Sequence, residues 1–461
     1  MWDAFCAMPG KVYQGHHGKR ACMHITRWRE DVALMRELGL KAYRLSIAWP
    51  RILPDGTGDV NEAGLEFYDG LIDALLNAGI EPYITLFHWD LPIKLHHRGG
   101  WMNPDIVNWF ADYTKIVVDR YSDRVKNWIT LNEPQCFILL GHQDGTHAPG
   151  LKLPEADILQ IGHNALLAHG RSVQVIREHA KQPARIGIAP VGIVSIPETE
   201  RAVDIEAARR ATFEGATDSL FNSTWWMDPV FHGRYPEAAV KQRLDNMPVV
   251  TADHMKLISQ PIDFCAFNLY QAGVVRAGAD GEVEPVQYPE GHPVTAMEWP
   301  VTPAGLYWAC RFFHERYDKP LLITENGLSC HDWVSIDGKV HDPNRIDFLT
   351  RYLAYVARAC EEGIPVDGYF QWSVMDNFEW AEGYKDRFGL IYVDYATGKR
   401  IPKDSYEWYR NTIQTNGSQL PSWEKCGFGT LDQSPKVTIK EDLPSPSRPA
   451  KKSPGKRPHS S

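Results

Sequence analysis

Short apolar runs, most of them followed by a stretch with helical periodicity, constrain the fold of this 461-residue chain more than any other feature. The runs are rich in β-branched or aromatic residues. Between them, apolar side chains recur three or four positions apart, as Trp28, Val32 and Met35 do before Gly39. Such alternation predicts a parallel sheet covered by helices. The seven runs are Ala42–Trp49, Pro82–Trp89, Val125–Asn132, Arg185–Pro190, Asp263–Tyr270, Leu321–Asn326 and Val366–Val374.

The ends of these runs indicate which kind of parallel sheet forms. Nearly every run is apolar at its start and finishes on polar or aromatic residues, with the sequences HWD, NEP, NLY, TEN and QWS. In a (β/α)8 barrel, functional groups gather at the carboxyl ends of the strands. A doubly wound sheet would instead have a single switch point, usually with a glycine-rich phosphate loop, and neither GxGxxG nor GxxxxGK[ST] follows a run here. We therefore predict an α/β fold of the (β/α)8 TIM-barrel class, as a single domain.

The number of runs raises a question about closure of the barrel. A closed cylinder needs eight strands, and the sequence offers seven. We expect that the first barrel strand is absent from this chain, which would leave two unpaired sheet edges. A gene prediction shortened at its N-terminus is the simplest explanation, and a helix or loop that fills the gap is the alternative.

The C-terminal part of the chain differs in amino-acid composition from the rest. Residues 442–461 are rich in Pro, Ser and basic side chains and have no apolar periodicity, which is typical of disorder. We expect a barrel domain over residues 1–416, incomplete at its N-terminus, and a disordered tail over residues 417–461. Lys451, Lys452, Lys456 and Arg457 leave a nuclear-import or polyanion-binding role open, although a solvated tail is the simpler interpretation.

Charge and composition exclude several classes of partner. The net charge is -9, so the main body should repel nucleic acid. No run of 18 apolar residues exists, and the first residues lack the pattern of a signal peptide. The eight cysteines form no CxxC pair, which favours free thiols in a reducing compartment. We expect a cytoplasmic protein that binds a small molecule and uses neither cofactor nor metal; the oligomeric state is left open.

Two glutamates at the ends of different runs suggest the chemistry. Glu133 follows the third run inside TLNEP, and Glu325 follows the sixth inside ITENG. Cleavage of a glycosidic bond needs one carboxyl group to protonate the leaving oxygen and another to stabilise the positively charged sugar carbon. Either glutamate alone would more often be a salt-bridged surface residue. Together at one barrel mouth, they predict a glycosidase.

The motifs around these glutamates resemble those of glycoside hydrolase family 1, the retaining β-glucosidases and their relatives. The matching segments run from Trp2 to about Tyr409 and include WDAFC, YRLSIAWPRILP, GTHAPG, DFCAFNLY, DNFEW and RFGLIYVDY. The resemblance implies that Glu133 is the acid/base and Glu325 the nucleophile of a β-glucosidase. Retaining enzymes hold these carboxyl groups about 5–5.5 Å apart, whereas inverting enzymes separate them by about 6.5–9.5 Å. We expect the shorter separation.

The resemblance also implies substrate-binding roles around the two glutamates. We expect Arg44 to keep Glu325 ionised, Tyr270 to hydrogen-bond it with Asn268 nearby, and Asn132 to bind the sugar 2-hydroxyl. The remaining residues are His88 and Trp89 for other hydroxyls, Trp372 for the pocket floor, Glu379 and Trp380 for the far hydroxyls, and Trp299 for the aglycone side.

Subfamily differences narrow the expected substrate. Thioglucosidases of the family carry Gln in place of Glu133, so we expect O-glycosides here. The carboxylate of Glu379 would repel a 6-phosphate, which favours an unphosphorylated sugar. The expected activity is hydrolysis of terminal non-reducing β-D-glucosyl residues, as in cellobiose and aryl or alkyl β-glucosides.

One departure from the family pattern leaves alternatives open. The family's first strand carries a YQxEG segment whose Gln contacts outer sugar hydroxyls, and no residue here takes that role. A truncated, inactive relative that only binds sugar is therefore one alternative. A barrel enzyme acting on longer β-glucans is another.

Overall fold

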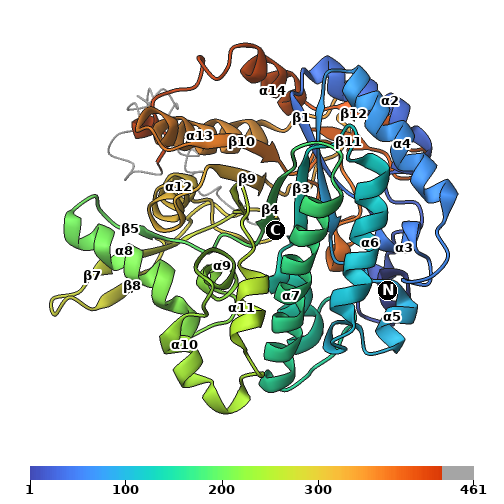
Figure 1. Cartoon of the computed structure of the whole chain (residues 1–461). Helices are drawn as coiled ribbons and strands as arrows, with labels where there is room; N and C mark the ends of the chain where they lie inside the picture. Colours follow the sequence, from blue (N-terminus) through green and yellow to red (C-terminus); the bar gives the residue numbers. More distant parts are fainter. Residues whose placement is uncertain (428–461) are drawn as a thin grey trace, which may run out of the picture. The chain divides into compact units, whose positions relative to one another are not determined.

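Seven parallel strands form the centre of the computed structural model, which describes residues 1–427. Hydrogen bonds join them in the order β1, β2, β3, β4 and in the order β6, β9, β10. A parallel bridge between Val191 and Asn268 links the wall just beyond β4 to β6 (Figure 1). The strands are β1 (Ala42–Ser46), β2 (Glu81–Phe87), β3 (Asn127–Asn132), β4 (Arg185–Ala189), β6 (Cys265–Asn268), β9 (Leu321–Asn326) and β10 (Val366–Gln371).

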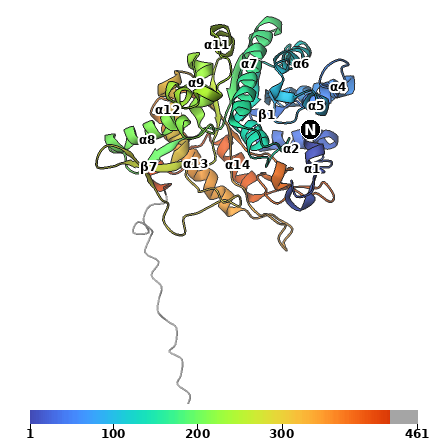
Figure 2. The ribbon, with the colours of Figure 1, turned by 90° about the horizontal axis from the view of Figure 1, so that it is seen from below.

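Helices surround this wall, and α13 and α14 lie on the opposite side from α6 and α7 (Figure 2). The helices are α1 (Trp2–Cys6), α2 (His24–Leu38), α3 (Trp49–Ile52), α4 (Glu62–Asn77), α5 (Ile93–His97), α6 (Ile106–Tyr121), α7 (Glu155–His179), α8 (Ala202–Glu214), α9 (Ser223–His232), α10 (Glu237–Gln242), α11 (Ala252–Ile258), α12 (Ala304–Tyr317), α13 (Pro343–Glu361) and α14 (Asp404–Gln414). Short 3-10 turns are η1 (Tyr13–Gly15), η2 (Gly100–Met102), η4 (Gly215–Thr217), η5 (Leu244–Asn246), η6 (Trp380–Glu382) and η7 (Trp423–Lys425). The segment η3 (Cys136–Gln143) is a π-helix.

The apolar periodicity of the sequence accounts for how the helices pack. In α2 the predicted face is buried, with Val32, Met35 and Leu38 inside, and the helix ends at Gly39 in the left-handed conformation with φ 83°. Glycine adopts that conformation without the steric penalty of a Cβ atom, so it closes the helix where the sequence predicts.

The strands are shorter than most of the apolar runs that predict them. The first run was expected to continue to Trp49, but β1 ends at Ser46 and Trp49 begins α3. Beyond β2 and β3 the backbone turns out of the sheet through the left-handed region at Trp89 (φ 77°) and Glu133 (φ 44°). Trp89 and Glu133 therefore lie just beyond their strands at the barrel mouth, whereas Asn132, Asn268 and Glu325 are the last or next-to-last residues of β3, β6 and β9.

Two smaller sheets lie outside the barrel wall and were not predicted. One contains β5 (Ser195–Pro197), β7 (Gly273–Ala277) and β8 (Val283–Val286), and α8 packs against it. The other is the antiparallel pair β11 (Ile391–Val393) and β12 (Arg400–Pro402).

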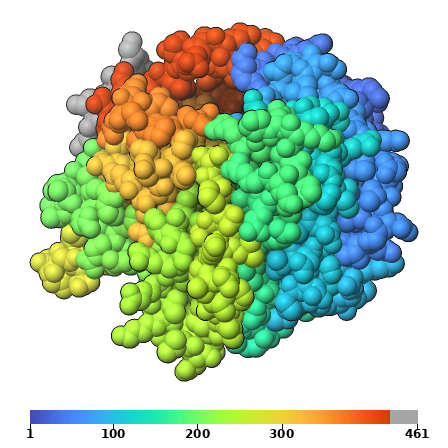
Figure 3. Space-filling view, viewed as in Figure 1, coloured from blue at the N-terminus to red at the C-terminus, as the bar shows by residue number. Residues whose placement is uncertain are grey.

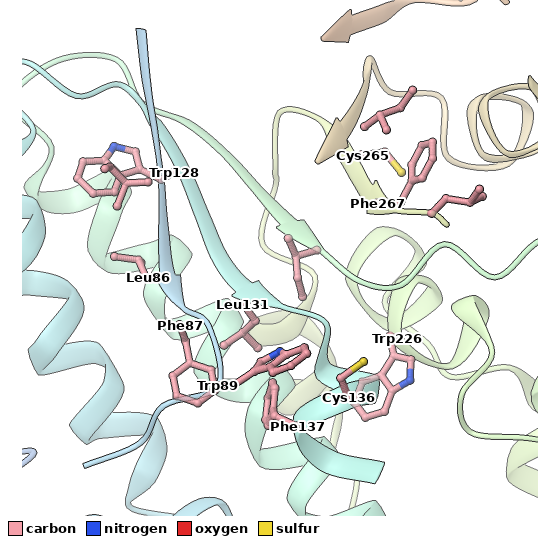
Figure 4. Close-up of a cluster of buried hydrophobic side chains, with 14 of the residues drawn as sticks. Leu86, Phe87, Trp89, Trp128, Leu131, Cys136, Phe137, Trp226, Cys265 and Phe267 are labelled. Carbon is pink, nitrogen blue, oxygen red and sulfur yellow. The ribbon is translucent and has the colours of Figure 1, made fainter. Parts of the chain in front are cut away.

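A large part of the core lies beneath the mouth on the β2 and β3 side (Figure 4). Phe87, at the end of β2, packs edge-on against Phe137 of η3 at 5.0 Å between ring centroids. Trp128 and Leu131 of β3 are fully buried. This packing anchors the two strands that end nearest to Glu133.

An open seam separates β1 from β10. Within residues 1–427, no strand pairs with the outer edge of either. A cavity of about 710 Å³ lies there, lined by residues of both strands and by apolar side chains of α13. Figure 3 shows a hollow between the red-orange C-terminal elements and the blue N-terminal ones. On the outside, α14 joins the two sides, since Tyr406 donates to the Leu34 carbonyl of α2 at 2.7 Å. The absence of the first barrel strand from this chain stays a prediction.

Part of the predicted tail packs against the barrel. Trp423 of η7 lies 3.8 Å from the guanidinium of Arg358 on α13, measured to the ring centroid. Residues 428–461, which include the Pro/Ser/basic segment, lie outside the described residues, so the predicted division into domain and tail stays a prediction. In the described part of the chain, no helix has the length and apolar character of a membrane span.

Backbone exchange should reveal the open edge of β1. Glu81 donates to the Lys41 carbonyl, and Ile47 to the Thr85 carbonyl. The hydrogen-bonding groups of Lys41 and Ile47 therefore face β2. Because these groups alternate in direction along a strand, the N–H groups of Ala42, Arg44 and Ser46 point away from β2. We predict that the amides of Ala42, Arg44 and Ser46 exchange with deuterium at least tenfold faster than those of Tyr43 and Leu45, as measured by residue-resolved hydrogen exchange. Equal protection along β1 would mean that another segment covers this edge.

Candidate active site

One pocket at the carboxyl ends of the strands brings together the residues singled out from the sequence. Its volume is about 320 Å³. Nine of the twelve predicted site residues line it, and both glutamates are buried, with exposed fractions of 6% for Glu133 and 4% for Glu325. Arg44, Asn132 and Asn268 do not line the pocket but hydrogen-bond to residues that do. The nine are His88, Trp89, Glu133, Tyr270, Trp299, Glu325, Trp372, Glu379 and Trp380.

The Arg44 guanidinium connects two sides of the site. Nη1 donates to Glu325 Oε1 at 2.6 Å, and Nη2 donates to Asn132 Oδ1 at 2.6 Å. Nε donates to Thr85 Oγ1 at 3.1 Å. Thr85, which pairs with Ser46 across β1 and β2, thus also holds the Arg44 side chain. Three hydrogen bonds in fixed directions keep this cation against Glu325.

Tyr270 binds the other oxygen of Glu325. Its hydroxyl donates to Oε2 at 2.9 Å, while burial and the neighbouring carboxylates raise its pKa well above the usual value, so it stays protonated. Its ring is tilted against Trp299, with 5.1 Å between ring centroids. Glu325 therefore accepts one hydrogen bond from a cation and one from a neutral hydroxyl, so each of its two oxygens has a donor.

Glu133 occupies a different environment. Asn268 Nδ2 donates to its Oε1 at 2.9 Å and to Asn132 Oδ1 at 3.0 Å. Burial, followed by repulsion from Glu325, raises the pKa of Glu133 to about 8, although the bond from Asn268 acts in the opposite direction. At neutral pH this carboxyl is therefore protonated while Arg44 stabilises the charge of Glu325.

The far end of the pocket combines aromatic rings with another buried carboxyl. Trp372 Nε1 donates to Glu379 Oε2 at 3.3 Å, and burial raises the pKa of Glu379 to about 8. The His88 ring lies nearly parallel to both Trp372 and Trp380, at 5.9 Å from each. Trp89 Nε1 donates to the Asn132 carbonyl at 3.1 Å. Flat apolar faces beside hydrogen-bonding groups suit a sugar ring.

A buried aspartate fixes the loop that carries Glu379 and Trp380. Asp376 accepts from Lys403 Nζ at 2.8 Å, from Arg387 Nη1 at 2.6 Å and from the Gly389 amide at 3.0 Å. Gly389 permits this close approach, because a Cβ atom there would lie 2.1 Å from the Asp376 nitrogen. The loop is therefore tied down at its base.

Other residues of the site were not identified from the sequence. Further apolar side chains line the pocket, among them Leu140 of η3 and, from loops, Ile193, Phe221 and Met297; their sequence pattern does not differ from that of ordinary core. The sequence did carry a signal for Thr324, because it stands directly before Glu325 in ITENG, and its hydroxyl bonds to Asn268 at 2.6 Å.

Comparisons with known proteins agree with this geometry. Residues 1–418 match the profile of Glycosyl hydrolase family 1. Beta-glucosidase A of Thermotoga maritima is 44% identical over 90% of this chain and 92% of its own length, and Beta-glucosidase A of Acetivibrio thermocellus is 42% identical with the same coverage.

Solved structures show the same likeness. The Thermotoga maritima family 1 β-glucosidase in complex with isofagomine lactam superposes with a TM-score of 0.81 at 44% identity, covering 90% of this chain and 92% of that one. The enzyme in complex with glucoimidazole gives 0.82. The predicted (β/α)8 TIM-barrel class is confirmed, and the chain belongs to glycosyl hydrolase family 1.

Proposed function

We propose that this glycoside hydrolase is a retaining β-glucosidase that removes terminal non-reducing β-D-glucosyl residues. One observation carries the proposal. Two buried glutamates share a pocket, but one is bound by a guanidinium and the other has its pKa raised to about 8. Acid-assisted nucleophilic displacement requires one protonated and one ionised carboxyl group, and different environments can hold two glutamates in these two states.

In the first step, Glu325 would attack the anomeric carbon while Glu133 gives its proton to the glycosidic oxygen. The bond from carbon to the aglycone oxygen breaks, a bond from carbon to Glu325 forms, and the aglycone leaves as a neutral alcohol. Tyr270 and Arg44 would hold the attacking carboxylate in place. The expected carboxyl separation of about 5–5.5 Å belongs to this step and remains a prediction.

In the second step, Glu133 would change from acid to base. Once Glu325 is an ester it no longer carries a charge, so its repulsion no longer raises the pKa of Glu133. The ionised Glu133 then takes a proton from water, the water oxygen bonds to the anomeric carbon, and Glu325 leaves as a carboxylate. Two inversions give net retention of configuration.

The remaining predicted residues would bind the glucosyl unit. Asn132, oriented by Arg44, is suited to the 2-hydroxyl beside the reacting carbon. His88 supplies a polar ring edge, and Trp89, whose N–H already binds the Asn132 carbonyl, supplies a flat face beside it. Trp372 would form the floor, and Glu379 with Trp380 would bind the far hydroxyls. Trp299, packed on Tyr270, would line the aglycone side.

These residues favour neutral O-glucosides as substrates. An acid at Glu133 serves alcohol leaving groups, and no lysine or arginine of the described residues lines the pocket to bind a sugar phosphate. Cellobiose and aryl or alkyl β-glucosides fit these limits. Two relatives from Thermotoga neapolitana are named 1,4-beta-D-glucan glucohydrolase, so longer β-glucans are included in the test. All eight cysteines are free, which supports action in a reducing compartment such as the cytoplasm.

A sugar-binding protein without turnover is the second candidate. The open seam favours it, because Arg44 itself lies on β1 and lines the seam cavity. Binding of glucose or a glucoside with no release of product by purified protein would select this alternative.

Replacing the proposed nucleophile tests the function directly. We predict that the unaltered protein releases β-glucose first from an aryl β-glucoside, as seen by proton NMR before mutarotation. Glu325→Gln should lose at least about 10⁴-fold in kcat because the amide cannot form the covalent intermediate. Initial release of α-glucose, or substantial turnover by the variant, would contradict the proposal.

The proposed acid should show a dependence on the leaving group. Glu133→Gln should lose at least about 10³-fold in kcat/KM on cellobiose, whose alcohol needs protonation. With 2,4-dinitrophenyl β-glucoside, whose phenolate leaves unaided, kcat/KM should fall less than tenfold. A uniform loss on both substrates would remove Glu133 from the acid role.

The pH profile should report the protonation of Glu133. Its pKa of about 8 places the acid form below that pH. We predict that kcat/KM for alkyl β-glucosides is sustained up to about pH 8 and then declines about tenfold per pH unit, because the reactive form has lost its proton. Glu379 also has a pKa raised to about 8, so the profile of Glu379→Gln serves as a control. A decline that begins below pH 6 would contradict the assignment.

A further inference from the structure

A buried threonine next to the proposed nucleophile is connected to the proposed acid/base on the other side of the pocket. Thr324, in β9, is 1% exposed and its hydroxyl lies 2.6 Å from Asn268 Oδ1. Asn268 is fully buried, and its amide nitrogen reaches Glu133 Oε1 and Asn132 Oδ1. One side-chain amide thus connects β9 to the end of β3.

The direction of these hydrogen bonds follows from the Arg44 guanidinium, which can donate hydrogen bonds but cannot accept them. Arg44 has only N–H groups, so the Asn132 oxygen that it binds at 2.6 Å must be an acceptor. Asn268 therefore turns its NH₂ group toward Asn132 and Glu133, and its oxygen faces Thr324. The threonine hydroxyl is left as the donor. Every hydrogen-bonding atom of the Asn268 side chain then has a partner.

We propose that Thr324 is a positioning residue whose hydroxyl holds the Asn268 amide so that one of its N–H groups points at Glu133. In doing so, it sets the pH range over which Glu133 exchanges its acid and base roles. The proposal rests on the proposed function, since it deepens the role given there to Glu133. Thr324 acts only through Asn268 and does not itself touch the reacting atoms.

The physical basis is the greater strength of a hydrogen bond to a charged acceptor. An N–H directed at a carboxyl group stabilises its ionised form and lowers its pKa. The bond from Asn268 acts in this direction on Glu133, against burial and the charge of Glu325. Loss of the Thr324 hydroxyl would leave a fully buried amide oxygen without its donor, so the amide would be held less well and Glu133 would keep its proton to higher pH.

Other groups act on Glu133 from the elements around it, and they are unchanged by substitution of Thr324. They are Glu325 of β9, Arg44 of β1, Cys136 of η3, which follows Glu133 in the chain, Tyr270 after β6 and Glu379 after β10. The guanidinium of Arg44 still fixes Asn132, so the amide of Asn268 should loosen without reversing.

The test compares Thr324→Val, which keeps the side-chain shape but removes the donor, with Thr324→Ser, which keeps the donor.

In Thr324→Val the alkaline limb of kcat/KM for an alkyl β-glucoside should move up by roughly half to one pH unit. With 2,4-dinitrophenyl β-glucoside, breakdown of the glycosyl-enzyme limits kcat and Glu133 acts as base. The acidic limb of kcat should therefore move up in the same direction. Thr324→Ser should restore both limbs to within about 0.2 pH units.

The matched control is Thr114→Val in α6, another buried threonine, which does not line the pocket and whose hydroxyl donates to the Phe110 carbonyl at 2.8 Å. It should lose stability in thermal unfolding without moving either limb. If Thr324→Val folds and lowers activity equally at every pH, the residue is merely structural and the proposal is wrong.

A direct titration keeps this test separate from the test of activity. The chemical shift of the ¹³C-labelled Glu133 carboxyl carbon, assigned with Glu133→Gln, reports its pKa without turnover. The value should be higher in Thr324→Val than in the unaltered protein and in Thr324→Ser. An unaltered protein without turnover would refute the proposed function alone, whereas equal pKa values in the three proteins would refute the role of Thr324.

Discussion

The site depends on one buried ion pair, between Arg44 and Glu325. Both side chains are 6% exposed, and their closest atoms are 2.6 Å apart. Taking two charges out of water is expensive, and the pair repays that cost only when the remaining polar atoms are also bonded. Here Thr85 and Asn132 accept the other N–H groups of Arg44, and Tyr270 donates to the second oxygen of Glu325. The charge of Glu325 is thereby fixed in position before any substrate arrives.

The protonation of Glu133 follows from burial and from that charge. Burial penalises a carboxylate at this position, and repulsion from Glu325 adds to the penalty, so the pKa of Glu133 rises to about 8. Asn268 moderates this effect and is itself oriented by Asn132, which Arg44 holds. A single cation thus binds one carboxyl group directly and is connected to the other through two amides.

Barrel topology makes this arrangement possible, and that part could be predicted from the sequence. Polar residues at the ends of apolar runs had to meet at one rim, because parallel strands end on the same side of a sheet. The motifs TLNEP and ITENG were sufficient to place Glu133 and Glu325 there, and all twelve predicted residues lie in or directly behind one pocket.

What the sequence could not predict depends on loop conformation and on hydrogen-bond direction. Phe221 and Met297 reach the pocket from loops with no periodicity to read. Strand ends were placed too late, as at Trp49, because aromatic residues suit both a strand and the turn that follows it. The role of Asp376 in tying the Glu379 loop to Lys403 depends on contacts between segments far apart in the chain.

The seam between β1 and β10 bears on the same ion pair. Arg44 lines the seam cavity, yet its side chain is almost completely shielded from solvent. Its partners explain this, since Thr85, Asn132 and Glu325 all lie on β2, β3 and β9, on the inner side of the wall. The exposed part of β1 is its backbone edge, whereas the charge lies inside the barrel. The unpaired edge therefore leaves the bonds of Arg44 in place, because the residues that bind its guanidinium lie on strands that are paired on both sides.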